Sequence, residues 1–222
     1  MKVILFGATG MVGQGVLREC LLDVEVTSVL AVGRSASGET AGKLRDIVLP
    51  DPSDLSSVTA DLADADACLF CLGVSAAGMS EADYRKITFD LTLKVARSLV
   101  EANPKMTFIY VSGAGTDGTA RGRTMWARVK GETENALLAL PFARAFMFRP
   151  ALIQPMHGIR SRTPIYRAAY TVLGPILPFA KKVLPGQVTT TEIVGKAMLR
   201  VAKHGASVSV LENADINLLG KA

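Results

Sequence analysis

Cysteine, histidine and tryptophan are scarce in this sequence, whose 222 residues include three cysteines, two histidines and one tryptophan. Three cysteines cannot form a disulfide framework of the kind that small secreted proteins use. Cys68 and Cys71 make a C-x-x-C motif, but they lie in the apolar run 67–72, and the sequence offers no second pair of ligands. We therefore expect buried strand thiols, and neither a metal site nor a redox site.

Long runs of one residue class are missing as well. The net charge of +5 comes without a Lys/Arg run, so the basic and aromatic pattern of nucleic-acid binders is absent and a pocket for an anionic ligand is favoured. No apolar stretch reaches membrane-spanning length uninterrupted, and the chain begins with a predicted strand in place of a signal peptide. These absences predict a cytoplasmic protein with no nucleic-acid partner and no transmembrane segment.

The composition, 49% hydrophobic and 20% charged, suits one globular domain with a full-sized core. Apolar strands alternate with helical patterns, which predicts an α/β fold with a doubly wound parallel sheet. We expect a nucleotide-binding core over residues 1–150 and a small C-terminal substrate or lid portion over residues 151–222. Strands are expected at 3–6, 24–32, 44–49, 67–72, 106–111, 142–148 and 207–211, and helices after residue 10 and at 53–62, 81–103, 124–140 and 187–203.

The first fifteen residues, MKVILFGATGMVGQG, carry the most informative motif. A short apolar run precedes three glycines at a spacing of three, which predicts a buried strand, a tight turn and the start of a helix. Backbone N–H groups of such a turn, together with the positive end of the helix dipole, bind a pyrophosphate. The alternative is a strand–helix turn that binds nothing. The expected cofactor contacts are Gly7, Thr9, Gly10, Met11, Val12 and Gly13.

The second strand ends at Arg34 and Ser35, where a dinucleotide fold selects its cofactor. An acidic residue there would favour NAD, whereas an arginine pairs bidentately with a 2′-phosphate. NADP(H) is therefore favoured, NAD(H) stays open, and a solvated loop arginine is the alternative. Asp51 is placed to reach an adenine amino group, although a turn aspartate is the commoner case. Leu72, Gly73 and Pro150 complete the expected cofactor site at the same sheet edge.

Six motifs together resemble the short-chain dehydrogenases/reductases of the atypical or extended type, in the branch of small NAD(P)-binding, epimerase-like proteins. The motifs are GATGMVG at 7–13, VGRS at 32–35, CLG at 71–73, YVSGAG at 110–115, the helix that carries Lys130, and FRPALI at 148–153. The resemblance covers nearly the whole chain. It implies a Rossmann fold with an NAD(P) site, and it is less specific for a reaction.

In that family a tyrosine four residues before a lysine is the general acid/base, the lysine binds the nicotinamide ribose, and a serine after the fifth strand polarises the substrate oxygen. Lys130 matches the lysine, but Trp126 stands at the tyrosine position. The serine departs from the pattern as well, because Ser112 directly follows the strand and the next positions, Gly113 and Ala114, lack a hydroxyl. An indole N–H donates a hydrogen bond but has no accessible pKa for proton transfer. The resemblance thus implies a catalytic set of Lys130, Ser112 and Trp126 that lacks the usual acid. The substitutes considered are Tyr84, Thr116, His157, Tyr166 or a water, with packing or surface roles preferred for the histidine and the tyrosines.

Two functions remain open at this level. The first is an NADP(H)-dependent oxidoreductase that acts on a small carbonyl compound. The second is a catalytically inactive NADP(H)-binding regulator or sensor that contacts a protein partner or a membrane surface. The apolar segment 165–184, which begins at Ile165 and ends at Leu184, is either a helical lid over the substrate pocket or a peripheral membrane or subunit contact. Both a monomer and a homodimer fit the sequence.

Overall fold

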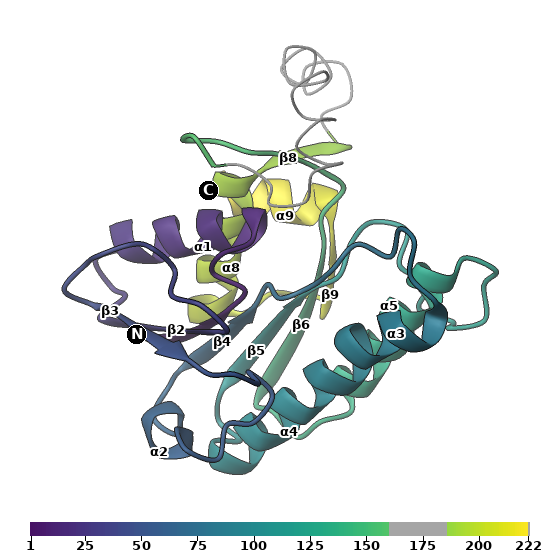
Figure 1. The fold of residues 1–222 in the computed structure, drawn as a ribbon. Coiled ribbons are helices and arrows are strands. Elements are labelled where there is room, and N and C mark those ends of the chain that lie inside the picture. The colour runs from purple at the N-terminus through teal and green to yellow at the C-terminus, as the bar shows by residue number, and fades with distance from the viewer. Residues whose placement is uncertain (160–185, 222) are drawn as a thin grey trace.

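Seven short strands form one sheet in the computed structural model, which describes residues 1–159 and 186–221 (Figure 1). The strand order is β3-β2-β1-β4-β5-β6-β9, and all six neighbouring pairs are parallel. Strands buried on both faces read as continuous apolar runs, which is the pattern of β1, β4 and β5. The bounds are β1 (Lys2–Phe6), β2 (Ser28–Gly33), β3 (Leu44–Val48), β4 (Ala67–Phe70), β5 (Thr107–Val111), β6 (Arg144–Arg149) and β9 (Val210–Glu212).

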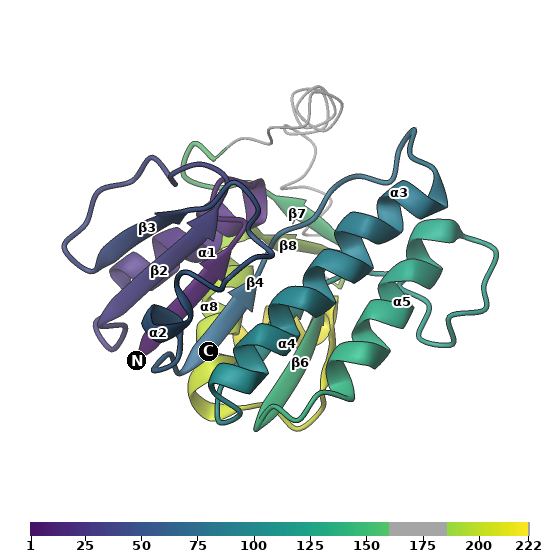
Figure 2. The ribbon, with the colours of Figure 1, turned by 60° about the horizontal axis from the view of Figure 1, so that its bottom comes forward.

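Helices cover both faces of this sheet, so that the molecule has three layers (Figures 1 and 2). One face carries α1 and α8, which pack on each other, with α9 against α8. The opposite face carries α4 and α5. The bounds are α1 (Met11–Leu22), α2 (Thr59–Leu62), α3 (Glu81–Arg85), the π-helical segment η1 (Lys86–Leu91), α4 (Thr92–Ala102), α5 (Met125–Leu138), α8 (Thr191–His204) and α9 (Asn213–Leu219).

Successive side chains of the central strands alternate between two apolar cores. Leu5 and Leu69 lie in the core under α1 and α8. Phe6 and Phe70 lie in the opposite core, where their ring centroids are 5.2 Å apart, and Phe108 extends this stack at 5.9 Å. Aromatic pairs at such distances add to the area that they bury. The cores therefore hold the central strands rigidly, and the strand ends can position a site.

The chain reverses its direction of travel across the sheet at β1. After β1 it forms β2 and β3 on one side, and it then returns to form β4, β5 and β6 on the other. At such a switch point the connections leave in opposite directions, and a crevice opens outside the carboxyl ends of the strands. The predicted doubly wound parallel sheet is confirmed.

Several element boundaries differ from the predictions. β2 begins at Ser28, since Val24 lies in a turn with 92% of its surface exposed. The expected helix 53–62 is reduced to the four residues of α2, because Asp51 and Asp54 instead cap tight turns at Ser53 and Ser56.

The C-terminal portion holds further differences. Residues expected to begin a helix form β8 (Val188–Thr190), which pairs in parallel with β7 (Leu152–Gln154) in a small separate sheet. The helix α8 then starts where the Thr190 side chain accepts a hydrogen bond from the N–H of Ile193. The tail, for which no element was expected, forms α9. This portion therefore adds β9 to the main sheet and α8 to its helical layer.

The expected helix 81–103 contains the π-helical segment η1 between α3 and α4. The wider turn is supported by Arg85, whose guanidinium lies 4.4 Å from the centre of the Phe89 ring. Single π turns within α-helices frequently occur at functional sites. Here η1 carries two residues that line the cavity described below.

The apolar segment 165–184, predicted to be a lid or a membrane or subunit contact, lies outside the described residues. Within the described ranges, every helix is too short or too polar to span a bilayer.

Candidate functional site

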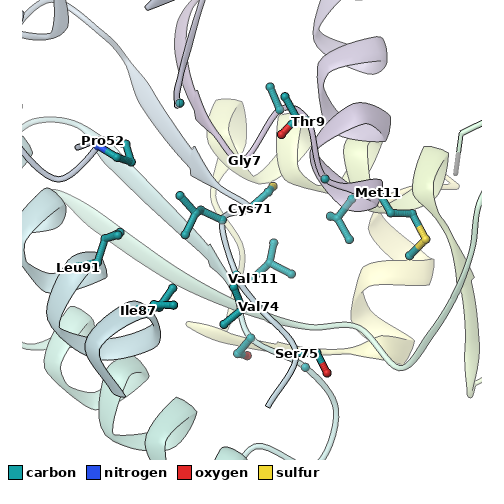
Figure 3. A pocket seen from close by; sticks show the side chains of 18 of the residues that line it. Gly7, Thr9, Met11, Pro52, Cys71, Val74, Ser75, Ile87, Leu91 and Val111 are labelled. Atoms are coloured by element: carbon teal, nitrogen blue, oxygen red, sulfur yellow. The ribbon is translucent and has the colours of Figure 1, made fainter. Parts of the chain in front are cut away.

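A cavity of about 1160 Å³ lies at the carboxyl ends of the strands around the switch point (Figure 3). Its volume exceeds the roughly 300–1,000 Å³ of pockets for drug-sized ligands. The glycine turn after β1, the ends of β2 and β3, the loop after β4 and the segment η1 form one part of its wall. The loop after β5, the helix α5 and the start of β7 form the other part. The cavity is large enough for a dinucleotide with a small substrate.

The glycine turn adopts the geometry that its sequence predicts. Gly7 has a φ of +82°, and a Cβ there would lie 2.7 Å from the backbone of Cys71. The N–H of Gly10 donates to the Gly7 carbonyl at 2.9 Å, which closes the turn. Gly10 is the N-cap residue of α1 and makes no side-chain hydrogen bond. The backbone N–H groups of the first helical turn are therefore not occupied by a capping side chain. Thr9 and Met11 face the cavity beside them (Figure 3).

Gly13 is the one expected cofactor contact that does not line the cavity. A Cβ at this position would lie 2.0 Å from the Gly7 carbonyl oxygen. Gly13 therefore lets α1 approach the turn and supports the site from behind, which is the packing role of a third glycine in such motifs.

Arg34 and Ser35 lie at the exposed end of β2 and line the same cavity. Asp46 of β3 shares this wall, and its carboxylate accepts hydrogen bonds from the N–H of Ser37 at 2.9 Å and the Ser37 hydroxyl at 3.0 Å. Sequence reasoning did not select Asp46, although its place in the strand beside β2 was a usable signal. An arginine and a carboxylate thus border the edge where the ribose of a dinucleotide would lie.

Asp51 is a turn aspartate, the commoner of the two cases that the sequence left open. Its carboxylate accepts hydrogen bonds from the Ser53 hydroxyl at 2.7 Å and the Ser53 N–H at 2.9 Å, and these bonds lower its pKa. It also lines the cavity. Asp51 is therefore a charged turn residue at the cavity edge.

The loop after β4 forms the middle of the cavity wall. Leu72 and Gly73 line it as expected, together with Cys71, whose thiol pKa is raised by burial, so the thiol is neutral. The sequence analysis missed the contribution of the helix opposite. Its residues Ile87 and Leu91 were assigned to packing, yet they reach the cavity from η1 (Figure 3). Helical periodicity alone gives no sign of the π turn that places them there.

Lys130, Trp126 and Ser112 meet at the other end of the cavity. The Lys130 ammonium donates a hydrogen bond to the Ser112 carbonyl oxygen. Burial lowers the Lys130 pKa to about 8, while the charge of Glu134 acts in the opposite direction. Trp126 lies one helical turn earlier, with its ring edge 3.5 Å from where a Cβ of Gly115 would be. The three predicted catalytic residues therefore share one end of the cavity.

The Ser112 hydroxyl is engaged by a buried carboxylate that the sequence analysis did not select. The hydroxyl donates a hydrogen bond to Glu134, which is 1% exposed. The Ser112 Oγ atom also lies 3.1 Å from the Phe148 carbonyl oxygen. Arg149 holds the same carboxylate through its Nε, at 3.1 Å and 3.2 Å from the two oxygens, and its Nη1 lies 2.9 Å from Glu212. The signals were present, because Glu134 follows Lys130 by one helical turn and Arg149 precedes Pro150 in the family motif.

Three other side chains considered as proton donors, Tyr84, Thr116 and His157, lie away from the cavity lining. Tyr84 is 1% exposed and lies in the core. The Thr116 hydroxyl donates to the Gly113 carbonyl at 2.7 Å. The Nε2 atom of His157 lies 2.9 Å from Glu192. Tyr166 lies outside the described residues.

The cavity fits a nicotinamide dinucleotide in the order of its chemical groups. A narrow backbone cradle at a helix N-terminus suits the pyrophosphate. Asp51, Leu72 and Leu91 border one end, where an adenosine would lie, and Lys130 with Pro150 borders the other, where a nicotinamide riboside would lie. In the two described ranges of the chain, His, Cys, Asp and Glu side chains form no group of three able to hold a metal ion.

Known proteins share this sequence pattern and fold. A family model for the NAD dependent epimerase/dehydratase family matches residues 3–132. The chain is 30% identical to the protein fmp52, mitochondrial, of Emericella nidulans over 204 residues, which cover 88% of this chain and 84% of that protein. It is also 30% identical to fmp52-1, mitochondrial, of Aspergillus terreus, with 99% of each chain covered.

Solved structures share the fold at low sequence identity. The ligand-free aldohexose dehydrogenase of Thermoplasma acidophilum gives a TM-score of 0.70 at 15% identity and covers 96% of this chain and 93% of its own. The Bordetella bronchiseptica enzyme WbmH, solved in complex with NAD+, gives 0.64 at 14% identity and covers 91% and 72%. These structures share the Rossmann-like fold that the sequence predicts.

The names of the relatives correct one prediction. Relatives from Emericella nidulans, Aspergillus terreus and Chaetomium globosum are all named mitochondrial proteins. This finding contradicts the predicted cytoplasmic location. The prediction was wrong because a missing secretory signal bears on export and not on transfer into an organelle.

Proposed function

Since the chain belongs to the NAD-dependent epimerase/dehydratase family, we propose that it is an NADP(H)-dependent oxidoreductase that acts on a small carbonyl compound. When bound, the nicotinamide supplies or accepts a hydride, and the protein contributes binding, orientation and electrostatics. Holding cofactor and substrate together in the right geometry can remove a large part of the barrier. The end of the cavity that is lined by Ser112, Trp126 and Lys130, the reaction end, differs from the family pattern, because Trp126 stands where the family has its tyrosine acid.

The observation that carries the choice of cofactor is the position of Arg34 and Ser35 in the same cavity as the glycine turn. A guanidinium binds a phosphate bidentately, and a neighbouring hydroxyl supplies one more donor. NAD(H) is the alternative cofactor. It is supported by Asp46 on the same wall and by the NAD+ complex of WbmH.

Each residue of the proposed site has a stated role. The N–H groups of the glycine turn bind the pyrophosphate, and Asp51 meets the adenine amino group. Lys130 donates to the nicotinamide ribose, while Ser112 and Trp126 border the substrate. The hydroxyl hydrogen of Ser112 is committed to Glu134, so the serine offers a substrate only acceptor capacity while that bond persists.

The test is consumption of NADPH, followed at its absorbance band, with a panel of small aldehydes, ketones, quinones and enones. The proposal is supported if the protein reduces one class of carbonyl compound and if a substitution in the glycine turn removes this turnover. Tight NADPH binding without turnover across the panel contradicts it and favours the second candidate function.

The second candidate is an NADP(H)-binding regulator that has lost its chemistry, and one observation favours it. Trp126 borders the reaction end of the cavity and cannot exchange a proton. In this case the nucleotide would control association with a protein partner or a membrane surface, and NADPH would change the mass of the complex in solution or its binding to vesicles.

The location proposed for this chain is the mitochondrion, because its curated relatives carry that location in their names. Fractionation of cells that express the full chain, with its native N-terminus and a small C-terminal tag, tests this. A signal confined to the cytosol would contradict it.

A further inference from the structure

The reaction end of the cavity lacks the ordinary proton donor. Four residues with ionised side chains line the cavity within the described part of the chain, namely Arg34, Asp46, Asp51 and Lys130. The first three lie at the β2 and β3 edge. Lys130 alone lies at the end bordered by β5, α5 and β7, beside Trp126.

Two hydroxyls close to Lys130 in the sequence and fold, those of Ser112 and Thr116, are committed elsewhere. The Ser112 hydroxyl donates to the buried Glu134, and the Thr116 hydroxyl donates to the Gly113 carbonyl. Tyr110 of β5 is 2% exposed, and burial raises its pKa, so the phenol is neutral and enclosed in the core. Ser75 also lines the cavity, but an alkyl hydroxyl is a far weaker acid than an ammonium. Lys130 is therefore the strongest acid among the described side chains at this end.

We propose that Lys130 is the general acid of the reduction, so that this chain replaces the family's tyrosine by its lysine. The inference rests on the proposed function and deepens it. In the step, the Nζ–H bond of the ammonium breaks and an O–H bond forms on the carbonyl oxygen, while the carbonyl carbon receives the hydride that NADPH supplies. The carbonyl becomes an alcohol, NADPH becomes NADP+, and the neutral amine regains a proton from water.

The surroundings of Lys130 suit this role. One of its three N–H bonds goes to the Ser112 carbonyl, which anchors the amine at the cavity wall. The charged group that acts on it is Glu134 on its own helix, and Glu134 pairs with Arg149 of β6. Lys130 is thus left without a direct carboxylate partner among the described residues. Burial lowers its pKa to about 8, which leaves it mostly protonated and still able to release a proton near neutral pH.

Trace labelling of the apoprotein with acetic anhydride measures the titration of the Lys130 amine, and it needs no enzymatic turnover. The neutral amine reacts, so the labelling of Lys130 at each pH, read by peptide mass spectrometry, reports its deprotonated fraction. The exposed Lys105 is the internal reference. We expect a half-maximal rate near pH 8 for Lys130, and protection of Lys130 by NADPH but not by 2′,5′-ADP. A midpoint above pH 10 would overturn the inference.

Lys130→Arg separates proton donation from cofactor binding. Arginine keeps the charge and the hydrogen-bond donors but does not release its proton. We expect NADPH affinity within about threefold of the wild type and a kcat at least about 10²-fold lower, the range of a lost general acid. The probe is 9,10-phenanthrenequinone, and Lys105→Arg is the matched control. The wild-type kcat should fall as the pH rises above about 8.

Failure of the Lys130 inference can be distinguished from failure of the proposed function. Weaker NADPH binding with an unchanged kcat in Lys130→Arg would mean that Lys130 only holds the ribose, and it would overturn this inference alone. No NADPH binding by the wild type, or binding without turnover of the quinone or of the carbonyl panel, would overturn the proposed function, and the inference with it.

Discussion

Gly10 and Gly13 occupy equivalent places in the sequence motif but have different structural roles. A Cβ at Gly10 would have only the Gly7 carbonyl oxygen nearby, at 3.4 Å, whereas a Cβ at Gly13 would overlap that oxygen at 2.0 Å. Gly10 lines the cavity, whereas Gly13 is packed against the turn. The sequence motif alone gives both the same role.

Gly10→Asp should weaken nucleotide binding while the fold persists. The side chain has room, and its carboxylate places a like charge beside the pyrophosphate. We expect NADPH affinity to fall at least about tenfold, a cost near 1.4 kcal/mol, and the melting temperature to change by less than about 4 °C. Calorimetric titration and thermal unfolding measure the two quantities.

Gly13→Ala is the matched variant for this experiment. It should lower the free energy of unfolding by about 1–3 kcal/mol, since the overlap forces α1 away from the turn. Unchanged NADPH affinity in a well-folded Gly10→Asp protein would remove the glycine turn from the binding site.

Arg34→Ala should weaken NADPH binding far more than NADH binding. A hydrogen-bonded charge pair contributes about 1.5–3 kcal/mol, which predicts a loss of roughly 10- to 100-fold for NADPH. Asp46→Asn is a useful companion, because loss of its negative charge should move selectivity towards NADPH. Equal losses for both nucleotides in Arg34→Ala would show that the arginine does not meet the 2′-phosphate.

Lys130 should also affect the pH dependence of stability. Its pKa in the folded protein is about 8, below the ordinary 10.5, so between these values the unfolded chain binds more protons. Stability from this residue therefore increases as the pH rises through that window. We expect the wild type to gain stability relative to Lys130→Met between pH 8 and pH 10, measured by urea unfolding. A constant difference would contradict the lowered pKa.

At the scale of elements, the sequence predicts the strands and helices of the main sheet better than the pieces around the site. The central strands are apolar on both faces, so β1, β4 and β5 could be identified from composition alone. The π turn η1 depends on contacts between helices, among them Arg85 with Glu132 of α5. No local pattern records such contacts. β7 and β8 are three residues each and pair across a long segment, which periodicity cannot detect.

The tail helix α9 is tied to the cavity wall by one buried side chain. Asn213 accepts a hydrogen bond from the Ala151 N–H at 2.9 Å and donates to the Gly186 carbonyl at 2.8 Å. Asn213→Ala leaves both backbone groups without this partner and should cost about 1–3 kcal/mol in the free energy of unfolding. Asn135→Ala, at an exposed position on α5, is the control. Equal, small losses in the free energy of unfolding of the two variants would contradict the role assigned to Asn213 in holding the tail.

At the scale of the whole molecule, the site follows from the topology. The reversal at β1 opens the crevice, and nearly all of the predicted cofactor residues line it because they follow parallel strands whose carboxyl ends share one edge. Ile87, Leu91 and Glu134 were missed because helices bring them to the site from the side. A doubly wound parallel sheet can be predicted from an alternating sequence pattern, whereas the approach of a helix to a cavity depends on packing.

The central claim is that this cavity binds NADP(H) with its nicotinamide end beside Trp126, the only tryptophan in the chain. The most direct measurement is a fluorescence titration of the purified protein with NADPH and with NADH. The account predicts quenching of Trp126 by both nucleotides, with NADPH acting at a concentration at least about tenfold lower, as expected for one added phosphate contact. Absence of quenching, together with absence of binding heat for either nucleotide, would contradict it.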